Sequence, residues 1–269
     1  MNLLVLKLLL APALIAAATL VARRFGPALG GWVSALPFIA GPVLLIFALE
    51  RGAAFAQRAA AGTLLGMVSL VAFIVVYVRL APRRGVVTSL FAGWVAFFSL
   101  TAATARWEPS VAVAGAAVVI ALGLGGALAR EFDPSSTLPA PGGGSGLLLM
   151  RVLATAALVL FLSALGGVLG PHVGGMLAAF PVLASLLAAF THLGDGGRAA
   201  AALLRGMITG LVGFAGFCLV AALTLASWGL PLGFLAASLA ALALHGTTLP
   251  LVARGEHPTR EAAAARGAG

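Results

Sequence analysis

Charged residues are scarce in this chain, and apolar residues are unusually common. Only 9% of the 269 residues are charged, whereas 62% are apolar. A soluble globular domain is closer to half apolar and a quarter charged. Several apolar runs approach the roughly 20 residues that a helix needs to cross a bilayer core of about 30 Å. Because backbone polar groups at that depth must be satisfied internally, the composition excludes an ordinary soluble domain and predicts an all-α membrane protein.

Residues typical of enzyme and metal sites are also few. The chain has seven acidic residues, four histidines and one cysteine, Cys218, which lies inside an apolar run and excludes a disulfide framework. It contains no HExxH, GxSxG or P-loop motif, and no two histidines have the i,i+4 spacing of a helical metal site. We therefore expect no enzymatic activity, no catalytic residue, no cofactor and no bound metal.

The net charge of +9 does not indicate binding to nucleic acid. Most basic residues flank apolar runs, which is typical of membrane topology determinants, and no basic cluster is interleaved with exposed aromatics. Arginine strongly outnumbers lysine, and with the high Ala and Gly content this indicates a GC-rich bacterial genome. The expected partners are the lipid bilayer and a small-molecule substrate, without nucleic acid; a homodimer stays open.

An internal repeat is the strongest signal in the sequence. Residues 26–67 recur at residues 170–211 without a gap, at an offset of 144 positions. In a chain rich in Ala and Leu, chance identities would mostly be Ala and Leu, whereas most identities here are Gly and Pro. A duplicated membrane unit with backbone breakers at matched positions is typical of transporters built from repeats. The matched residues include Gly30 and Gly174, Gly31 and Gly175, and Pro37 and Pro181.

Nine apolar runs are long enough to be membrane spans, although eight or ten spans stay open. They lie near residues 3–22, 28–49, 57–79, 86–105, 109–129, 148–168, 172–192, 200–226 and 230–252. Residues 1–129 would hold the first four-span repeat and a connecting fifth span, and residues 148–252 the second repeat. Residues 130–147 are predicted to be a flexible linker, and residues 253–269 a short polar tail that we expect to be disordered.

The distribution of basic residues predicts the orientation of these spans. With nine spans, one face of the membrane receives twelve basic residues and the other face four. The positive-inside rule then places the N-terminus outside and the C-terminus in the cytoplasm, in a bacterial inner membrane. The first and sixth spans are five apart, an odd number, so the two four-helix repeats are expected to be inverted relative to each other.

This layout resembles the drug/metabolite transporter superfamily, whose members carry two inverted five-helix repeats; one helix would be absent here. The second half is also similar to the GlpM family of small bacterial inner-membrane proteins. The residues that carry this second resemblance are Gly175, Phe180, Pro181, Arg205, Gly206 and Met207. The first resemblance implies a transporter fold, and neither one identifies a substrate.

The repeated motif Gly-Pro-x-x-Gly-Gly-x₅-Pro is the first candidate site. Pro37 and Pro181 are expected near mid-membrane, where a proline removes one helical hydrogen bond and clashes with the preceding turn. The carbonyls freed near Val33 and Leu177 would then face a central cavity. Tolerated kinks, with glycines that allow close packing, are the alternative. The candidate residues of this motif are Gly30, Gly31, Pro37, Gly174, Gly175 and Pro181.

Four ionisable residues outside the motif are further candidates for binding or gating. Arg58 and Arg205 stand near the starts of the third and eighth spans. After superposition of the repeats they are offset by four residues, about one helical turn, so we expect both on the same helix face at similar depth. Glu50 closes the second span and is a candidate gating or proton-coupling carboxylate, with an interfacial ion pair as the alternative. His245 lies inside the ninth span, where an ionisable residue indicates function by default, although a bond to a backbone carbonyl would also satisfy it.

Together these features predict a secondary transporter or permease that works by alternating access. Its substrate would be a small hydrophobic, amphipathic or lipid-linked molecule, bound between Pro37 and Pro181. A non-transporting scaffold, or an accessory subunit of an envelope-synthesis complex, is the alternative. A channel is less favoured because no ring of polar residues recurs along one span.

Overall fold

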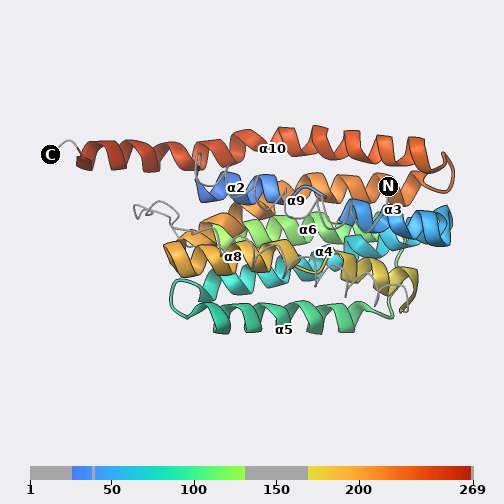
Figure 1. Cartoon of the computed structure of the whole chain (residues 1–269), viewed down its shortest axis with the longest axis horizontal. Helices are drawn as coiled ribbons and strands as arrows, with labels where there is room; N and C mark the ends of the chain where they lie inside the picture. Colours follow the sequence, from blue (N-terminus) through green and yellow to red (C-terminus); the bar gives the residue numbers. More distant parts are fainter. Residues whose placement is uncertain (1–25, 38–39, 131–168, 268–269) are drawn as a thin grey trace.

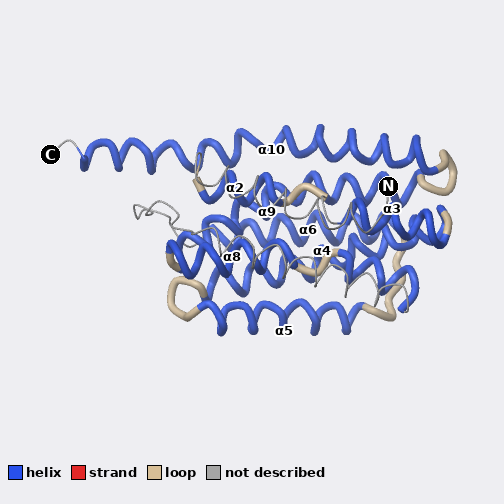
Figure 2. Tube along the Cα trace, in the orientation of Figure 1, coloured by secondary structure: helices blue, strands red, loops and turns tan. Residues whose placement is uncertain are grey.

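A computed structural model of the chain describes residues 26–37, 40–130 and 169–267. In these ranges every regular element is a helix, and Figure 2 shows short loops and turns between them. A helical stretch at residues 169–178 comes just before α8. The other helices are α2 (Pro27–Ser34), α3 (Ala40–Arg51), α4 (Ala53–Leu80), α5 (Val86–Thr104), α6 (Val111–Arg130), α8 (Val182–Asp195), α9 (Gly197–Thr224) and α10 (Leu230–Gly267).

Six helical segments in the described part of the chain are long and apolar enough to cross a membrane. They are Ala53–Leu80, Val86–Thr104, Val111–Ala129, Leu169–Asp195, Gly197–Thr224 and Leu230–Val252. Each corresponds to one of the predicted spans. The predicted span 28–49 is divided into two short helices, α2 and α3. The predicted spans 3–22 and 148–168, and the linker from residue 131 onward, lie outside the described residues.

The two longest of the inner helices, α4 and α9, pack against each other at the centre of the bundle. They are antiparallel, because the start of each lies beside the end of the other. The side-chain oxygen of Gln57 accepts a hydrogen bond from the backbone N–H of Ala226, just beyond α9 (2.8 Å). At the opposite end, Gly197 packs against the carbonyl oxygen of Ala81. In Figure 1, α5 and α10 lie at opposite edges of the bundle, packed on α4 and α9 respectively.

The outer helices α5, α6 and α10 expose large apolar side chains. Phe91 on α5, Ile120 on α6 and Leu239 on α10 are each more than half exposed. An apolar surface of this extent would be unfavourable in water and suits contact with lipid chains. The six long apolar helices and this outer surface are consistent with a polytopic α-helical membrane protein.

The helix boundaries repeat at the same 144-residue offset as the sequence. Helices α4 and α9 both contain 28 residues, and each follows a glycine with positive φ, Gly52 (88°) and Gly196 (89°). Glycine adopts this backbone conformation without the strain that a side chain would cause. Likewise α5 follows Gly85 and α10 follows Gly229, which is again 144 positions later. The repeat in helix boundaries therefore extends beyond the 42 residues in which the sequence repeat is evident.

The C-terminal segment differs from the expected disordered tail. Helix α10 continues past the predicted span to Gly267, and Figure 1 shows its end projecting beyond the other helices. Residues 253–267 are rich in Ala, Arg and Glu, which are strong helix formers. Because α10 is already formed before this segment, adding turns avoids the cost of a new nucleus.

Candidate functional site

Both halves of the chain contain an apolar segment that is interrupted just before or at a proline. Helix α2 ends at Ser34 and α3 begins at Ala40, while three residues separate the end of the helix at 169–178 from the start of α8. The N–H of Leu36 donates to the carbonyl of Val33 (3.4 Å), and the N–H of Phe180 donates to that of Leu177 (2.9 Å). The prediction that these two carbonyls are free is therefore wrong, because a tighter last turn satisfies them.

Neither proline lies inside a described helix: Pro181 directly precedes α8, and Pro37 lies three residues before the start of α3. The carbonyl of Pro37 accepts a hydrogen bond from the N–H of Gly41, and the carbonyl of Pro181 accepts one from the N–H of Ser185, both at 2.8 Å. The first N–H groups of a helix have no intrahelical partner, so a proline at this position removes no helical bond. The expected clash with a preceding turn does not arise here.

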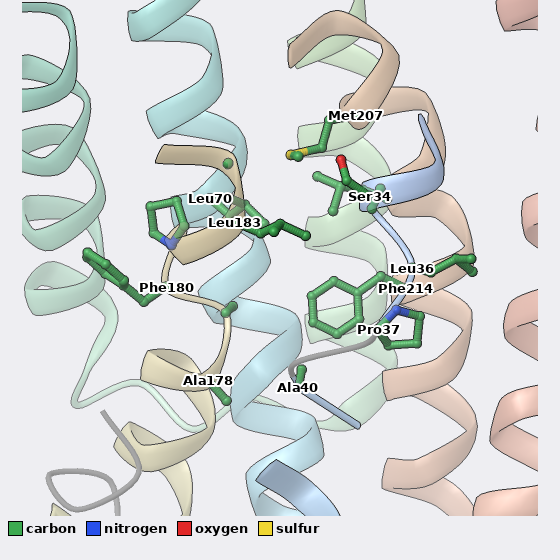
Figure 3. Close-up of a pocket in the computed structure, with 15 residues that line it drawn as sticks. Ser34, Leu36, Pro37, Ala40, Leu70, Ala178, Phe180, Leu183, Met207 and Phe214 are labelled. Carbon is green, nitrogen blue, oxygen red and sulfur yellow. The ribbon is translucent and has the colours of Figure 1, made fainter. Parts of the chain in front are cut away.

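The two breaks face a common cavity of about 60 Å³. Figure 3 shows Leu36 and Pro37 on one side of the cavity and Ala178 and Phe180 on the other. Helices α4 and α9 supply further walls. Many of the lining residues come from equivalent positions of the two repeats, 144 residues apart: Ser34 and Ala178, Pro37 and Pro181, Leu70 and Phe214.

The part of the cavity wall that the described residues form is apolar and carries no ionisable side chain. Ser34 supplies the one side-chain hydroxyl among the lining residues, and it donates to the carbonyl of Gly31 (2.7 Å). Pockets that enclose a metabolite-sized ligand usually have volumes of roughly 300–1,000 Å³. The present cavity has room for no more than a few water molecules. A larger molecule can enter only if the breaks move apart.

The predicted site glycines are not among the residues that line the cavity, and two of them lie in close contacts between helices. Gly31 on α2 packs against the carbonyl of Leu203 on α9, and Gly175 packs against the carbonyl of Ala59 on α4. The two contacts are equivalent, because both members of each are related by 144 positions. A side chain at either glycine would overlap the opposing carbonyl oxygen. Gly30 and Gly174, the glycines that precede them, are also buried.

Two further glycine contacts occur in both copies of the repeat. Each places a glycine of a long helix against a carbonyl of the short helix from the other half: Gly62 against His172 and Gly206 against Ala28, Gly66 against Met176 and Gly210 against Trp32. The first short helix of each half therefore packs on the long helix of the opposite half. Reciprocal contacts of this kind are those that a two-fold axis produces.

Three of the predicted ionisable candidates lie away from the cavity. Glu50 and Arg58 are exposed, Arg205 is partly buried on α9, and none of the three lines the cavity. The predicted similarity in depth between Arg58 and Arg205 does not bring either to the site. The sequence located these residues along their helices and left open which way they face.

His245 also lies outside the cavity wall, but it is buried where α10 meets α2 and α9. Its Nδ1 lies 3.1 Å from the carbonyl oxygen of Gly210. Because a carbonyl only accepts, Nδ1 carries the hydrogen. The indole of Trp32 stacks on the imidazole, with ring centroids 3.9 Å apart and an angle of 24° between the planes. The indole N–H of Trp32 donates to the hydroxyl of Thr248 (2.9 Å), so one polar and aromatic contact joins α2 to α10.

An aromatic cluster at the second break was not predicted from the sequence. The ring of Phe180 lies 5.3 Å from those of Phe97 and Phe98 and 6.2 Å from that of Trp94, all on α5. The indole N–H of Trp94 also donates to the hydroxyl of Ser185 on α8 (2.9 Å). The i, i+3, i+4 spacing of the three α5 aromatics places them on one helix face, which the sequence could have indicated. Their partner on the other half of the chain could not be inferred in this way.

Comparisons of the chain with protein-family models, curated protein sequences and solved structures find no match.

Proposed function

We propose that the protein is a secondary transporter or permease that moves a small hydrophobic or amphipathic molecule, lipid-linked molecules included, across a bacterial inner membrane. The cavity between Pro37 and Pro181 is the observation that carries this proposal. It is lined by equivalent positions of two repeats, at the points where two apolar segments are interrupted. Substrate sites of repeat-built transporters lie in this kind of place, between discontinuous helices near mid-membrane.

Packing between the two halves supports an inverted repeat. The reciprocal glycine contacts are those expected of a two-fold relation between the halves. Helices α4 and α9 are equivalent and antiparallel, so the axis runs across the bundle and not along it. In a membrane crossed by these helices, such an axis lies in the membrane plane. Two states that open to opposite faces are then equivalent by symmetry, which is the basis of alternating access.

The lining of the cavity restricts the chemistry of the substrate. An unpaired charge would be costly to bury among Leu70, Phe180 and Phe214, which favours an apolar or amphipathic molecule. The one hydroxyl of the lining, on Ser34, is already bonded to the backbone and has no neighbouring base to activate it in the cavity wall. Transport therefore fits this site better than catalysis. An ion gradient, or the substrate's own gradient, would supply the driving force.

Labelling from the two faces of the membrane tests this proposal. On a Cys218→Ala background, Ser34→Cys and Ala178→Cys would be exposed in oriented vesicles to a membrane-impermeant maleimide, from each face in turn. We expect both cysteines to react from both faces, because both positions line the cavity. Ala188→Cys is the matched control: it is fully buried on α8, one turn from the cavity-lining Ala184, and should react from neither face.

Two loop cysteines calibrate the experiment and test the orientation. Arg84→Cys, between α4 and α5, should react only from the cytoplasmic face, and Ser110→Cys, just before α6, only from the outer face. Protection of Ser34→Cys and Ala178→Cys from both faces, while the loop cysteines react, would contradict transport and favour a scaffold. Reaction of both from one face only would indicate a one-sided crevice, which also contradicts alternating access.

A further inference from the structure

The two halves of the chain differ at one equivalent contact near the cavity. The repeat positions of His245 and Trp32 are occupied by Thr101 and Met176, 144 residues away. The imidazole of His245 stacks on the indole of Trp32 where α10 meets α2, and the repeat-equivalent residues in the other half cannot form such a stack. The equivalent pair of the other half, Thr101 and Met176, has no titratable side chain, so the two pairs respond differently to protons.

The second ring nitrogen of His245, Nε2, is buried and has no hydrogen-bond partner among the residues that the structure describes. The side chain as a whole is 3% exposed. Since Nδ1 donates its hydrogen to the carbonyl of Gly210, Nε2 carries a lone pair that no described donor satisfies. A buried acceptor left without a donor is costly, and this nitrogen is therefore an atom to which a proton can add.

The described groups that contact the ring are neutral. Helix α9 presents Gly210 and Gly213 to it, α2 presents Trp32, and the neighbouring polar group on α10 is the hydroxyl of Thr248. None of these groups titrates in the physiological range. Along α9 the nearest charged residue is Arg205, five positions before Gly210, and α2 contains no charged residue. The indole face of Trp32 would attract a protonated ring, but one such contact replaces only part of the hydration that a buried imidazolium lacks.

We propose that Nε2 of His245 is the proton-binding site that couples transport to a proton gradient; this rests on the transport function proposed above. A proton from the aqueous phase adds to the Nε2 lone pair and forms an imidazolium, while the Nδ1–H remains on the carbonyl of Gly210. The imidazolium is poorly solvated in the packed state, so protonation favours separation of α2 from α10. Trp32 lies two residues before the cavity-lining Ser34, and the same movement therefore opens the cavity. Loss of the proton restores the stack.

Fluorescence of Trp32 tests proton binding directly, because the emission of the indole depends on the charge and position of the imidazole ring stacked against it. The signal is the difference in emission between the unmodified protein and Trp32→Phe in proteoliposomes. We expect this difference to follow a single-proton titration between about pH 5 and pH 8. The titration should disappear in His245→Gln and persist in His257→Gln, a control on the same helix twelve residues away. A flat signal in the unmodified protein would overturn the proposal.

The coupling to the cavity is tested by the labelling rate of Ser34→Cys, divided by that of Arg84→Cys to correct for thiol ionisation. We expect this ratio to be at least about fivefold higher near pH 5.5 than near pH 8, which is the lower end of typical coupling between two sites. The difference should vanish in His245→Gln. Two-sided labelling without a pH dependence would overturn proton coupling and leave the transporter intact. Protection from both faces, with Trp32 still titrating, would contradict both proposals.

A measurement on the unmodified protein guards against misfolding of His245→Gln. If that variant does not fold, the imidazole of His245 can be titrated by NMR in the isotope-labelled, otherwise unmodified protein. A His245 signal that changes with a single midpoint between about pH 5 and pH 8 supports the proposal. A signal that does not change across this range overturns it.

Discussion

The Gly175→Ala variant is expected to lose about 3 kcal/mol of stability or more, although the change adds a single methyl group. Overpacking a well-packed core typically costs about 1–3 kcal/mol and sometimes more. Here the new methyl group would overlap the carbonyl oxygen of Ala59 on α4, and a backbone carbonyl within a helix cannot rotate away as a side chain can. The cost should therefore lie at or above the upper end of that range.

A hydrogen bond from Thr63 further restrains the contact between Gly175 and α4. Its buried hydroxyl lies 2.8 Å from the carbonyl oxygen of Ala59 and 3.0 Å from that of Gly175, so one O–H group joins both sides of the contact. Helices that move apart to admit a methyl group would stretch this hydrogen bond as well as lose close packing. Gly31→Ala, at the repeat-equivalent position against Leu203, should be destabilising for the same steric reason.

Thermal unfolding of the purified protein in detergent measures the effect, with Gly123→Ala as the matched control. Gly123 lies on α6 and is exposed, and a methyl group there meets no atom within 4 Å. Alanine is a better helix former than glycine by about 1 kcal/mol, so this control should melt at the same or a higher temperature. If Gly175→Ala and Gly123→Ala melted together, the close approach of the short helix to α4 would be wrong.

Backbone breakers made the architecture the most predictable part of this protein. Pro37 and Pro181 stand out against an Ala- and Leu-rich background, and they do lie at a common cavity. The offset of 144 positions also carries the bounds of α4 onto those of α9. What the sequence could not distinguish was the role of the glycines. A glycine can line a cavity or allow two helices to pack closely, and the sequence is the same in both cases. The contacts of Gly31 with the carbonyl of Leu203 and of Gly175 with that of Ala59 show close helix packing.

The ionisable residues were harder to interpret, because position along a helix gives depth without direction. Glu50 and Arg58 were candidates for binding or gating because they stand at the ends of predicted spans, and both are exposed. His245 showed no sign in the sequence of its contact with α2. The hydrogen bond from Trp32 to Thr248 joins residues 216 positions apart, and no local pattern encodes it. Contacts between the two halves therefore had to come from the structure.

Phe97→Ala is expected to destabilise the second break while leaving the first unchanged. The side chain of Phe97 is fully buried, and its ring meets that of Phe180 edge-on, with centroids 5.3 Å apart and planes at 88°. Truncating a buried phenylalanine typically costs about 3–5 kcal/mol through lost contacts and the void that remains. Phe91→Ala on the same helix is the control, because Phe91 is 67% exposed on the outer surface and its loss should change the melting temperature little.

The same variant separates a local role of this aromatic cluster from a general loss of stability. Phe180 lines the cavity on the side of Pro181, and its equivalent at the first break is Leu36, which has no aromatic ring. Removing Phe97 frees Phe180 to move, so labelling of Ala178→Cys should accelerate relative to labelling of Ser34→Cys. An equal acceleration at both positions would mean that the whole bundle has loosened. An unchanged ratio with a lower melting temperature would mean that Phe97 stabilises α5 without controlling access to the cavity.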